Sequence, residues 1–277
     1  MPKKSPYKPE VGDVIIGRVV SVDKKSWRVN INSQRDANLN LTAINLPTGE
    51  QRRRSEDDVM QMRSFFEEND VLSGEVQQVH HDGGVNIQTR NLKYGKLKNG
   101  ILIEVNHNLI KKMKHHFFEL IPDLKTIIGM NGVIWVYYST IKLDNEYFSD
   151  DQNNLIAHNK LETPTEFASI NIILFKNIIK ALEGNKLQID QFTIMKFYEL
   201  YIELIEKHAT ISNVKLPEQE LLKSNIVIQK DNEREVVKKL KALIQANVKT
   251  GNIVDLGKEV ESLRKMAEMN EESEEEN

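Results

Sequence analysis

The sequence predicts an α+β protein in which a small β-barrel of five strands precedes an α+β domain with C-terminal helices. Short segments that alternate apolar and polar residues occupy positions 11–90, and helical patterns dominate after residue 165. The change from one pattern to the other falls in a glycine-rich segment, 82–100, with the sequence DGGVNIQTRNLKYGKLKNG. Alternation is the period of a strand, whereas apolar residues three and four apart are typical of an amphipathic helix. A chain of 277 residues is long enough for two such domains.

The composition excludes several classes of protein. The chain has no cysteine, which rules out disulfides and zinc sites built from thiolates. Its first residues have no apolar core for a signal peptide, and no later run is long enough for a membrane span. We therefore expect a soluble, intracellular protein with no membrane partner. A net charge of −3 implies that any contact with RNA is local, set by the distribution of charge.

Five segments alternate at the strand period in the first part of the chain. Trp27, Val29 and Ile31 share one face of the second segment, so we expect Trp27 to pack in a core rather than to stack on a base. Gly83 and Gly84 can supply the positive φ angles of a tight hairpin before the fifth segment. Five strands with a long connection after the third are the pattern of an oligonucleotide-binding (OB) barrel of the S1 type. The segments are 11–22, 26–32, 36–41, 71–80 and 85–90.

The main candidate RNA-binding site is the basic stretch at residues 90–114, which holds seven Lys or Arg against one acid, Glu104. Cations neutralise a phosphate backbone and release its counterions, and an aromatic ring can stack a base. Such a site would bind single-stranded RNA independently of sequence. A solvated linker that keeps a domain junction soluble is an equally good interpretation. The predicted RNA-binding residues are Arg90, Lys93, Tyr94, Lys96, Lys98, Lys111 and Lys112.

The long connection at 42–70 supplies a second group of cations. Arginines there can bind phosphates bidentately, but three acids follow the triple arginine at once. Intramolecular pairing or contact with a protein partner is therefore at least as well supported as contact with RNA. The candidates for RNA or partner contact are Arg52, Arg53, Arg54 and Arg63.

After residue 100 the pattern predicts a strand at 101–105, an amphipathic helix at 108–118, and strands at 126–130 and 133–138. The last two are joined by a turn at Gly129, Asn131 and Gly132. A Gly-x-x-Gly in a KH domain normally lies between helices, where it approaches phosphates. Here it lies between strands, which favours a structural turn over a nucleic-acid clamp. Helices are predicted from Thr165 and from Asp190, which we expect to cap its helix.

The expected domains are a short N-terminal lead (1–10), the S1 domain (11–97), an α+β domain (98–210) with an insertion at about 140–164, and a charged helical extension with an acidic tail (211–277). No cofactor fingerprint, nucleophile elbow or zinc motif is present. His80 and His81 are consecutive at a turn, so their side chains diverge, and His115 and His116 are expected on a solvated helix face. The sequence thus predicts no metal, no cofactor and no enzymatic activity.

Three segments go beyond a generic barrel: LPTGEQRRRSEDDVMQMRSF (46–65), QTRNLKYGKLKNG (88–100) and GMNGVIWV (129–136). In order and spacing they resemble the RNA exosome cap subunits of the ribosomal RNA-processing protein 4 family. The resemblance implies an S1/OB β-barrel followed by a KH-type α+β domain, and a non-catalytic role. It further implies seating with other S1-type caps on a ring of six RNase-PH-like subunits, where the cap forms the RNA entrance for 3′–5′ processing and degradation, including rRNA maturation. The implied location is the nucleus, nucleolus and cytoplasm.

Two features depart from that family. Its members are expected to carry a further small β domain before the barrel, whereas about ten residues precede Val11 here, so either the chain is shortened or its attachment to the ring differs. The charged extension after about Ser224 also has no counterpart in the resemblance. The alternative hypothesis is a free-standing S1/KH protein that binds structured RNA or ribosomes.

Overall fold

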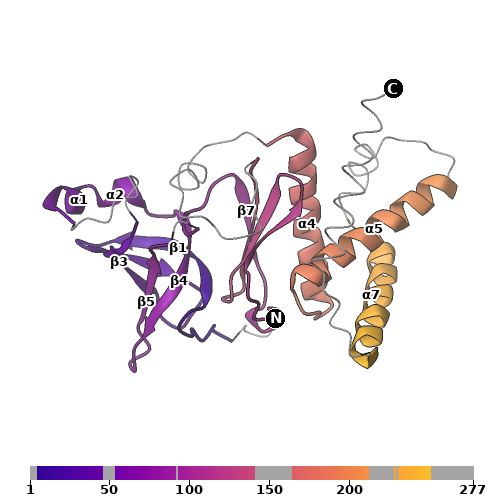
Figure 1. Ribbon diagram of the computed structural model, residues 1–277, viewed down its shortest axis with the longest axis horizontal. Coiled ribbons are helices and arrows are strands. Elements are labelled where there is room, and N and C mark those ends of the chain that lie inside the picture. The colour runs from indigo at the N-terminus through magenta and orange to yellow at the C-terminus, as the bar shows by residue number, and fades with distance from the viewer. Residues whose placement is uncertain are drawn as a thin grey trace.

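The computed structural model describes residues 5–45, 54–91, 93–140, 164–211, 228 and 230–250. Figure 1 shows the barrel at one end of the molecule, a second sheet in the middle, and helices at the other end. None of the helices described in these ranges combines the length and apolar character that a membrane span needs.

The predicted five-stranded barrel is confirmed. Its sheet runs in the order β1-β2-β3-β5-β4, and β4 also pairs with β1, which closes the barrel. Strands β3 and β5 are parallel and the other neighbours are antiparallel. A short strand, β6 (Gly95–Lys96), extends the sheet beside β4. The barrel strands are β1 (Val14–Val22), β2 (Ser26–Asn30), β3 (Ala37–Ile44), β4 (Val71–Val79) and β5 (Val85–Thr89).

Trp27 fills the centre of the barrel, as its position beside Val29 and Ile31 predicts. It is fully buried, its Nε1 donates to the carbonyl of Phe66 at 3.0 Å, and the ring of Phe66 meets it edge-on at 5.4 Å. Phe66 follows two short helices in the long connection, α1 (Glu56–Met60) and α2 (Met62–Phe65). This connection therefore closes one side of the barrel core.

The second sheet has the order β7-β10-β9-β8, with every pair antiparallel. Its strands are β7 (Gly100–Glu104), β8 (Phe117–Ile121), β9 (Leu124–Ile128) and β10 (Val133–Tyr138). The strands predicted at 101–105, 126–130 and 133–138 are confirmed within a few residues.

The helix predicted at 108–118 is wrong. A single 3₁₀ turn, η1 (His107–Leu109), is followed by extended chain and then β8. Phe118 and Leu120 alternate inward along β8, and Phe117 pairs with Ile127 of β9. Pairing with β9 thus decides this segment, and the apolar spacing that suggested a helix is overridden by tertiary contacts.

Helices cover one face of the second sheet. Helix α4 (Glu166–Gly184) begins at Thr165, whose side chain accepts from the backbone of Ala168, and α5 (Gln191–Ile211) follows. Both confirm the sequence prediction. A third helix, α7 (Lys230–Thr250), packs against α5 within the predicted charged extension. Most of the predicted insertion and the acidic tail lie outside the described residues.

The barrel and the second sheet are joined by the turn at Gly129–Gly132. Asn131 is 2% exposed, and its Nδ2 donates to the carbonyls of Ile16 at 2.7 Å and Ile31 at 3.1 Å. Its Oδ1 lies 3.3 Å from the backbone nitrogen of Ile16, which donates to it. Gly132 has a φ of +82°, and a Cβ there would lie 2.5 Å from the carbonyl oxygen of Val105. The turn therefore joins the barrel to the second sheet, and three of its four residues, Gly129, Asn131 and Gly132, are buried.

Candidate nucleic-acid interface

The structure distributes the predicted RNA-binding lysines of the basic stretch among ion pairs. Lys96 lies 2.5 Å from the carboxylate of Asp70, and its side chain is 29% exposed. Lys111 lies 3.9 Å from Asp190 at the start of α5. The positive charge counted in the sequence is therefore partly neutralised within the fold.

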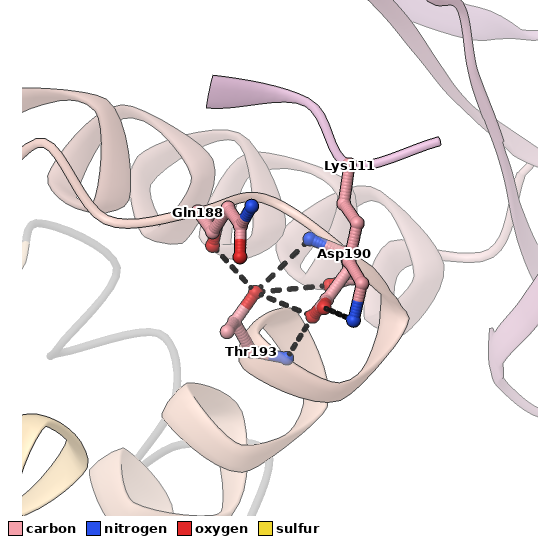
Figure 2. A network of polar contacts seen from close by, with 4 residues as sticks. All are labelled: Lys111, Gln188, Asp190 and Thr193. Carbon is pink, nitrogen blue, oxygen red and sulfur yellow. Dashed lines mark hydrogen bonds and ion pairs between the residues drawn. The ribbon is translucent and has the colours of Figure 1, made fainter. Parts of the chain in front are cut away.

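Figure 2 shows the polar network in which Lys111 takes part. The carboxylate of Asp190 accepts from the backbone nitrogen of Thr193 at 2.8 Å, which is the predicted N-cap of α5. The hydroxyl of Thr193 donates to the carbonyl of Gln188 at 2.9 Å. Lys111 adds a cation to the capping carboxylate, so it has a structural role in the second domain.

Lys112 holds the N-terminal lead to the second domain. Its Nζ lies 3.1 Å from the carboxylate of Glu10 and 3.2 Å from that of Asp13. Asp13 is 3% exposed and also accepts from the hydroxyl of Tyr7 and, at 3.1 Å, from the backbone of Glu10. Bonds to Glu10 and then to Asp13 raise the pKa of Lys112. This lysine is thus a junction residue.

Tyr94 does not present a ring to RNA. It is 7% exposed and packs against Phe117 with ring centroids 5.8 Å apart, in the apolar cluster between the domains. The Nζ of Lys93 lies 5.0 Å from the centroid of the Tyr94 ring, and burial raises the pKa of the Tyr94 hydroxyl. The stacking role predicted for Tyr94 is therefore wrong, because the domain junction buries the ring.

The arginine candidates have different surroundings. Arg54 is turned inward, where its Nε donates to the carbonyl of Leu41 at 3.0 Å and its Nη2 donates to that of Ile44. Arg63 is exposed but lies 2.8 Å from Glu68. Arg52 and Arg53 lie outside the described residues. Arg54 and Arg63 are thus both engaged within the fold, Arg54 with backbone carbonyls and Arg63 with a carboxylate.

Arg90 and Lys98 are the remaining cations of the predicted RNA-binding site. Arg90 is exposed at the end of β5, where its Nη2 donates to the carbonyl of Thr42 at 3.4 Å. Lys98 is half-buried after β6. Arg90 therefore lies at the edge of the barrel, next to the outward face of β3 and β5.

His116 is buried, which corrects its predicted place on a solvated helix face. It is 7% exposed just before β8, and its Nδ1 donates to the carbonyl of Ile128 at 2.8 Å. Burial lowers the pKa of the ring below 6.5, although the bond to Ile128 and the charge of Asp13 act against it. Desolvation also lowers the pKa of His107, which is less buried.

We expect the free energy of unfolding to fall as the pH drops below 6.5. In that range the unfolded chain binds a proton at His116 that the folded chain does not yet bind, so acid favours unfolding. His116→Gln should make the free energy of unfolding depend less on pH between pH 6.5 and 5. His107→Gln should remove part of the pH dependence that is left. Urea unfolding at several pH values measures this, and His115→Gln, at the exposed neighbouring position, is the control. An unchanged pH profile in His116→Gln would contradict the assignment.

The outward face of the barrel carries a site that the sequence analysis did not identify. One side chain from each of four adjacent strands lies in a single row across the sheet: Arg28 pairs with Asn38, Asn38 with Asn86, and Asn86 with Gln78. All four are exposed or half-buried. We call these residues the amide row. A row across four strands spans about 14 Å at the usual strand spacing.

The surroundings of the amide row are polar and carry charges of both signs. The Nε of Arg28 donates to the hydroxyl of Ser21 at 2.8 Å and lies 3.9 Å from the carboxylate of Asp23. Asn38 donates to Asn40 at 3.1 Å, and the amide of Asn86 lies 3.0 Å from Nε2 of His80. Lys24 and Lys25 are exposed in the turn between β1 and β2, at one end of the row, and His80 belongs to the β4–β5 turn at the other. Amide side chains offer donors and acceptors together, which suits base edges and the 2′-hydroxyl of RNA.

The signal for this face was present in the sequence. The outward positions of β2, β3 and β5 hold mostly amides and one arginine, beside Ser26 and Thr42, but alternation by itself only separates the outward face from the inward one. Recognising the row also requires the strand register, because β3 and β5 are far apart in sequence and become neighbours only when the barrel closes. Among the described residues, no group of three or more acidic or histidine side chains could hold a metal ion.

The geometry agrees with the matches to known proteins. Residues 6–78 match the family described as RRP4, S1 domain, and residues 100–142 match the KH domain. The chain is 39% identical over 204 residues to the exosome complex component rrp4 of Schizosaccharomyces pombe, covering 72% of this chain and 61% of that protein. Identity to RRP4 of Bos taurus is 40% over 196 residues, with coverages of 71% and 64%. Identity to RRP4 of Saccharomyces cerevisiae is 35% over 244 residues, and the match covers 75% of this chain and 67% of that protein. The chain thus spans about two thirds of the length of these relatives.

Proposed function

The chain belongs to the RRP4 family of exosome complex components, and from this premise we propose that it is a non-catalytic, RNA-binding cap subunit of an RNA exosome. The observation that carries the proposal is the position of the amide row. It lies on strands of the S1-type barrel, on the face that OB-type barrels use for oligonucleotides. Neighbouring cations would hold the phosphates of a single strand, independently of its sequence.

The residues that support RNA contact differ from those predicted first. Arg28, Asn38 and Asn86 replace Tyr94 and Lys112 at the centre of the site, because the latter two are engaged at the domain junction. Arg90 and Lys93 remain candidates at its edge, and Lys98 beside them. Amide groups would bind the 2′-hydroxyl, so RNA would be preferred over DNA of the same sequence.

The domain junction supports the role of a cap. Asn131 and the lead held by Lys112 fix the barrel against the second sheet, so the barrel face keeps one orientation relative to whatever the second domain contacts. In the proposed assembly the chain sits with other S1-type caps on a ring of RNase-PH-like subunits and helps to form the entrance for RNA. It would thereby support 3′–5′ processing and degradation, including rRNA maturation, in the nucleus, nucleolus and cytoplasm.

A tagged copy of the chain, recovered from native extract at moderate salt, tests this role. We expect six RNase-PH-like proteins and two further S1-type caps in equal amounts by quantitative mass spectrometry. Nuclease treatment of the extract is the control, because an assembly held by protein contacts survives it and one bridged by RNA does not. Recovery of the chain alone, or with ribosomal proteins, would favour a free-standing S1/KH protein and would contradict the proposal.

A further inference from the structure

Helix α7 carries a basic stripe on its exposed surface, outside its packing face. Val236, Val237 and Leu240 are buried, and the helix contacts α5. Asn185, just after α4, donates to Glu233 at 2.7 Å and ties the first turn of α7 to the second domain. On the outward side Arg234, Lys238 and Lys241 are exposed at spacings of four and three, which places them along one face. We call these three residues the α7 stripe.

The charges of α7 are segregated along its length. All its acids lie within its first six residues, whereas residues 236–250 hold four lysines and no acid. The helix dipole explains acids at the start of a helix, and it favours cations only within the last turn. Lys238 and Lys241 lie more than two turns before Thr250, so the dipole does not account for them.

Ion pairing accounts for only part of this charge. Lys239 lies 3.0 Å from Glu235, and Arg234 lies 3.5 Å from Asp231 across a fully solvated contact. In the described part of the chain no ion pair joins Lys238 or Lys241 to an acid. Like charges at these spacings repel each other and weaken a helix. An anion bound along the stripe would relieve that repulsion.

We propose that Arg234, Lys238 and Lys241 form a second phosphate-binding surface, which holds the backbone of an RNA strand whose other part lies on the barrel. The inference rests on the proposed RNA-binding function. Figure 1 shows α7 at the end of the molecule opposite the barrel, and it lies outside both segments that match the S1 and KH families. A strand must therefore be long to reach both surfaces, and binding at one raises the effective concentration at the other.

The test compares two lengths of single-stranded RNA by fluorescence anisotropy with the full chain. An oligonucleotide of about 8 nucleotides fits within the site size of one OB-type barrel, and one of about 40 exceeds it. For Lys238→Ala/Lys241→Ala, we expect about tenfold weaker binding of the longer RNA and a salt slope smaller by about 1.4, since each phosphate contact to a single strand contributes about 0.7. Binding of the short RNA should not change.

A matched control removes two other exposed lysines, through Lys176→Ala and Lys186→Gly. Glycine is chosen at the second position because Lys186 has a φ of +54°. Equal loss in the control, or equal loss for both RNA lengths, would overturn the second surface in favour of a general charge effect. An unchanged affinity for the longer RNA would assign the stripe to something other than RNA. If the wild-type chain binds neither RNA, the RNA-binding function itself fails, and the inference fails with it.

Discussion

Asn131→Ala should lower the free energy of unfolding by about 3–5 kcal/mol, the largest effect that we expect from one exchange in this chain. The exchange removes one acceptor and two donor interactions and leaves three backbone groups of Ile16 and Ile31 buried without their partner. Each such group costs about 1–3 kcal/mol when it is left unpaired. Urea unfolding followed by Trp27 and Trp135 fluorescence, one tryptophan in each domain, measures the loss. Because the side chain joins the domains, the two halves should also unfold less cooperatively.

Two further variants sharpen the test. Asn131→Asp keeps an acceptor for the nitrogen of Ile16 but faces two carbonyls with no donor and a buried charge, so it should be at least as destabilising as alanine. Asn108→Ala removes an exposed asparagine from the same domain and should change stability by less than about 0.5 kcal/mol. A value for Asn131→Ala close to that of Asn108→Ala would show that the junction does not depend on this side chain.

The barrel was predictable from sequence because its strands bury one face each. Alternation at Trp27, Val29 and Ile31 fixes which side of β2 points inward, and burial on that side follows directly. The segment at 108–118 shows where the same approach fails. Its apolar residues have helical spacing, but Ile110 bridges to Ile189, just before α5, and Phe117 and Phe118 pair with β9. These contacts determine its backbone. Local pattern carries no information about such a partner.

The candidate site was less predictable than the fold, for a physical reason. A count of lysines measures charge along the chain, whereas phosphate binding depends on charge that remains exposed after folding. Asp13, Asp70 and Asp190 neutralise lysines from which they are separated by 26 to 99 positions in sequence. Tyr94 was predicted to stack on RNA because it lies between lysines, yet the same position brings it under Phe117 at the junction.

The amide row was not predicted from sequence, because none of its members is distinctive alone. Asn38 and Asn86 are 48 positions apart in sequence, and only the parallel pairing of their strands makes them neighbours. Arg28 and Gln78 join the row through two further pairings. A surface assembled from four strands is therefore a property of barrel closure, and it becomes visible only when the register is known.

Replacing the row should abolish most of the affinity for short RNA. In Arg28→Ala/Asn38→Ala/Asn86→Ala we expect about a 100-fold weaker binding of single-stranded RNA of about 8 nucleotides, from roughly 1 kcal/mol for each hydrogen-bonding side chain removed. The wild type should bind RNA more tightly than DNA of the same sequence, and the variant should lose that preference, because amides can bond the 2′-hydroxyl. Anisotropy titrations with both strands measure the two effects in one experiment.

The control for this variant is Arg63→Ala, which removes one exposed arginine from α2 in the long connection and leaves the row intact. Its affinity for RNA should stay within about twofold of the wild type, which corresponds to the small effect of one paired surface charge. The row residues are exposed or half-buried, so the triple variant should keep the melting temperature of the wild type within a few degrees. If the triple variant binds RNA as the wild type does while Arg90→Ala/Lys93→Ala does not, the contact lies at the barrel edge, and hydrogen bonding across the barrel face has no part in it. If the triple variant binds RNA and DNA more weakly by the same factor, the row contributes through the charge of Arg28 alone.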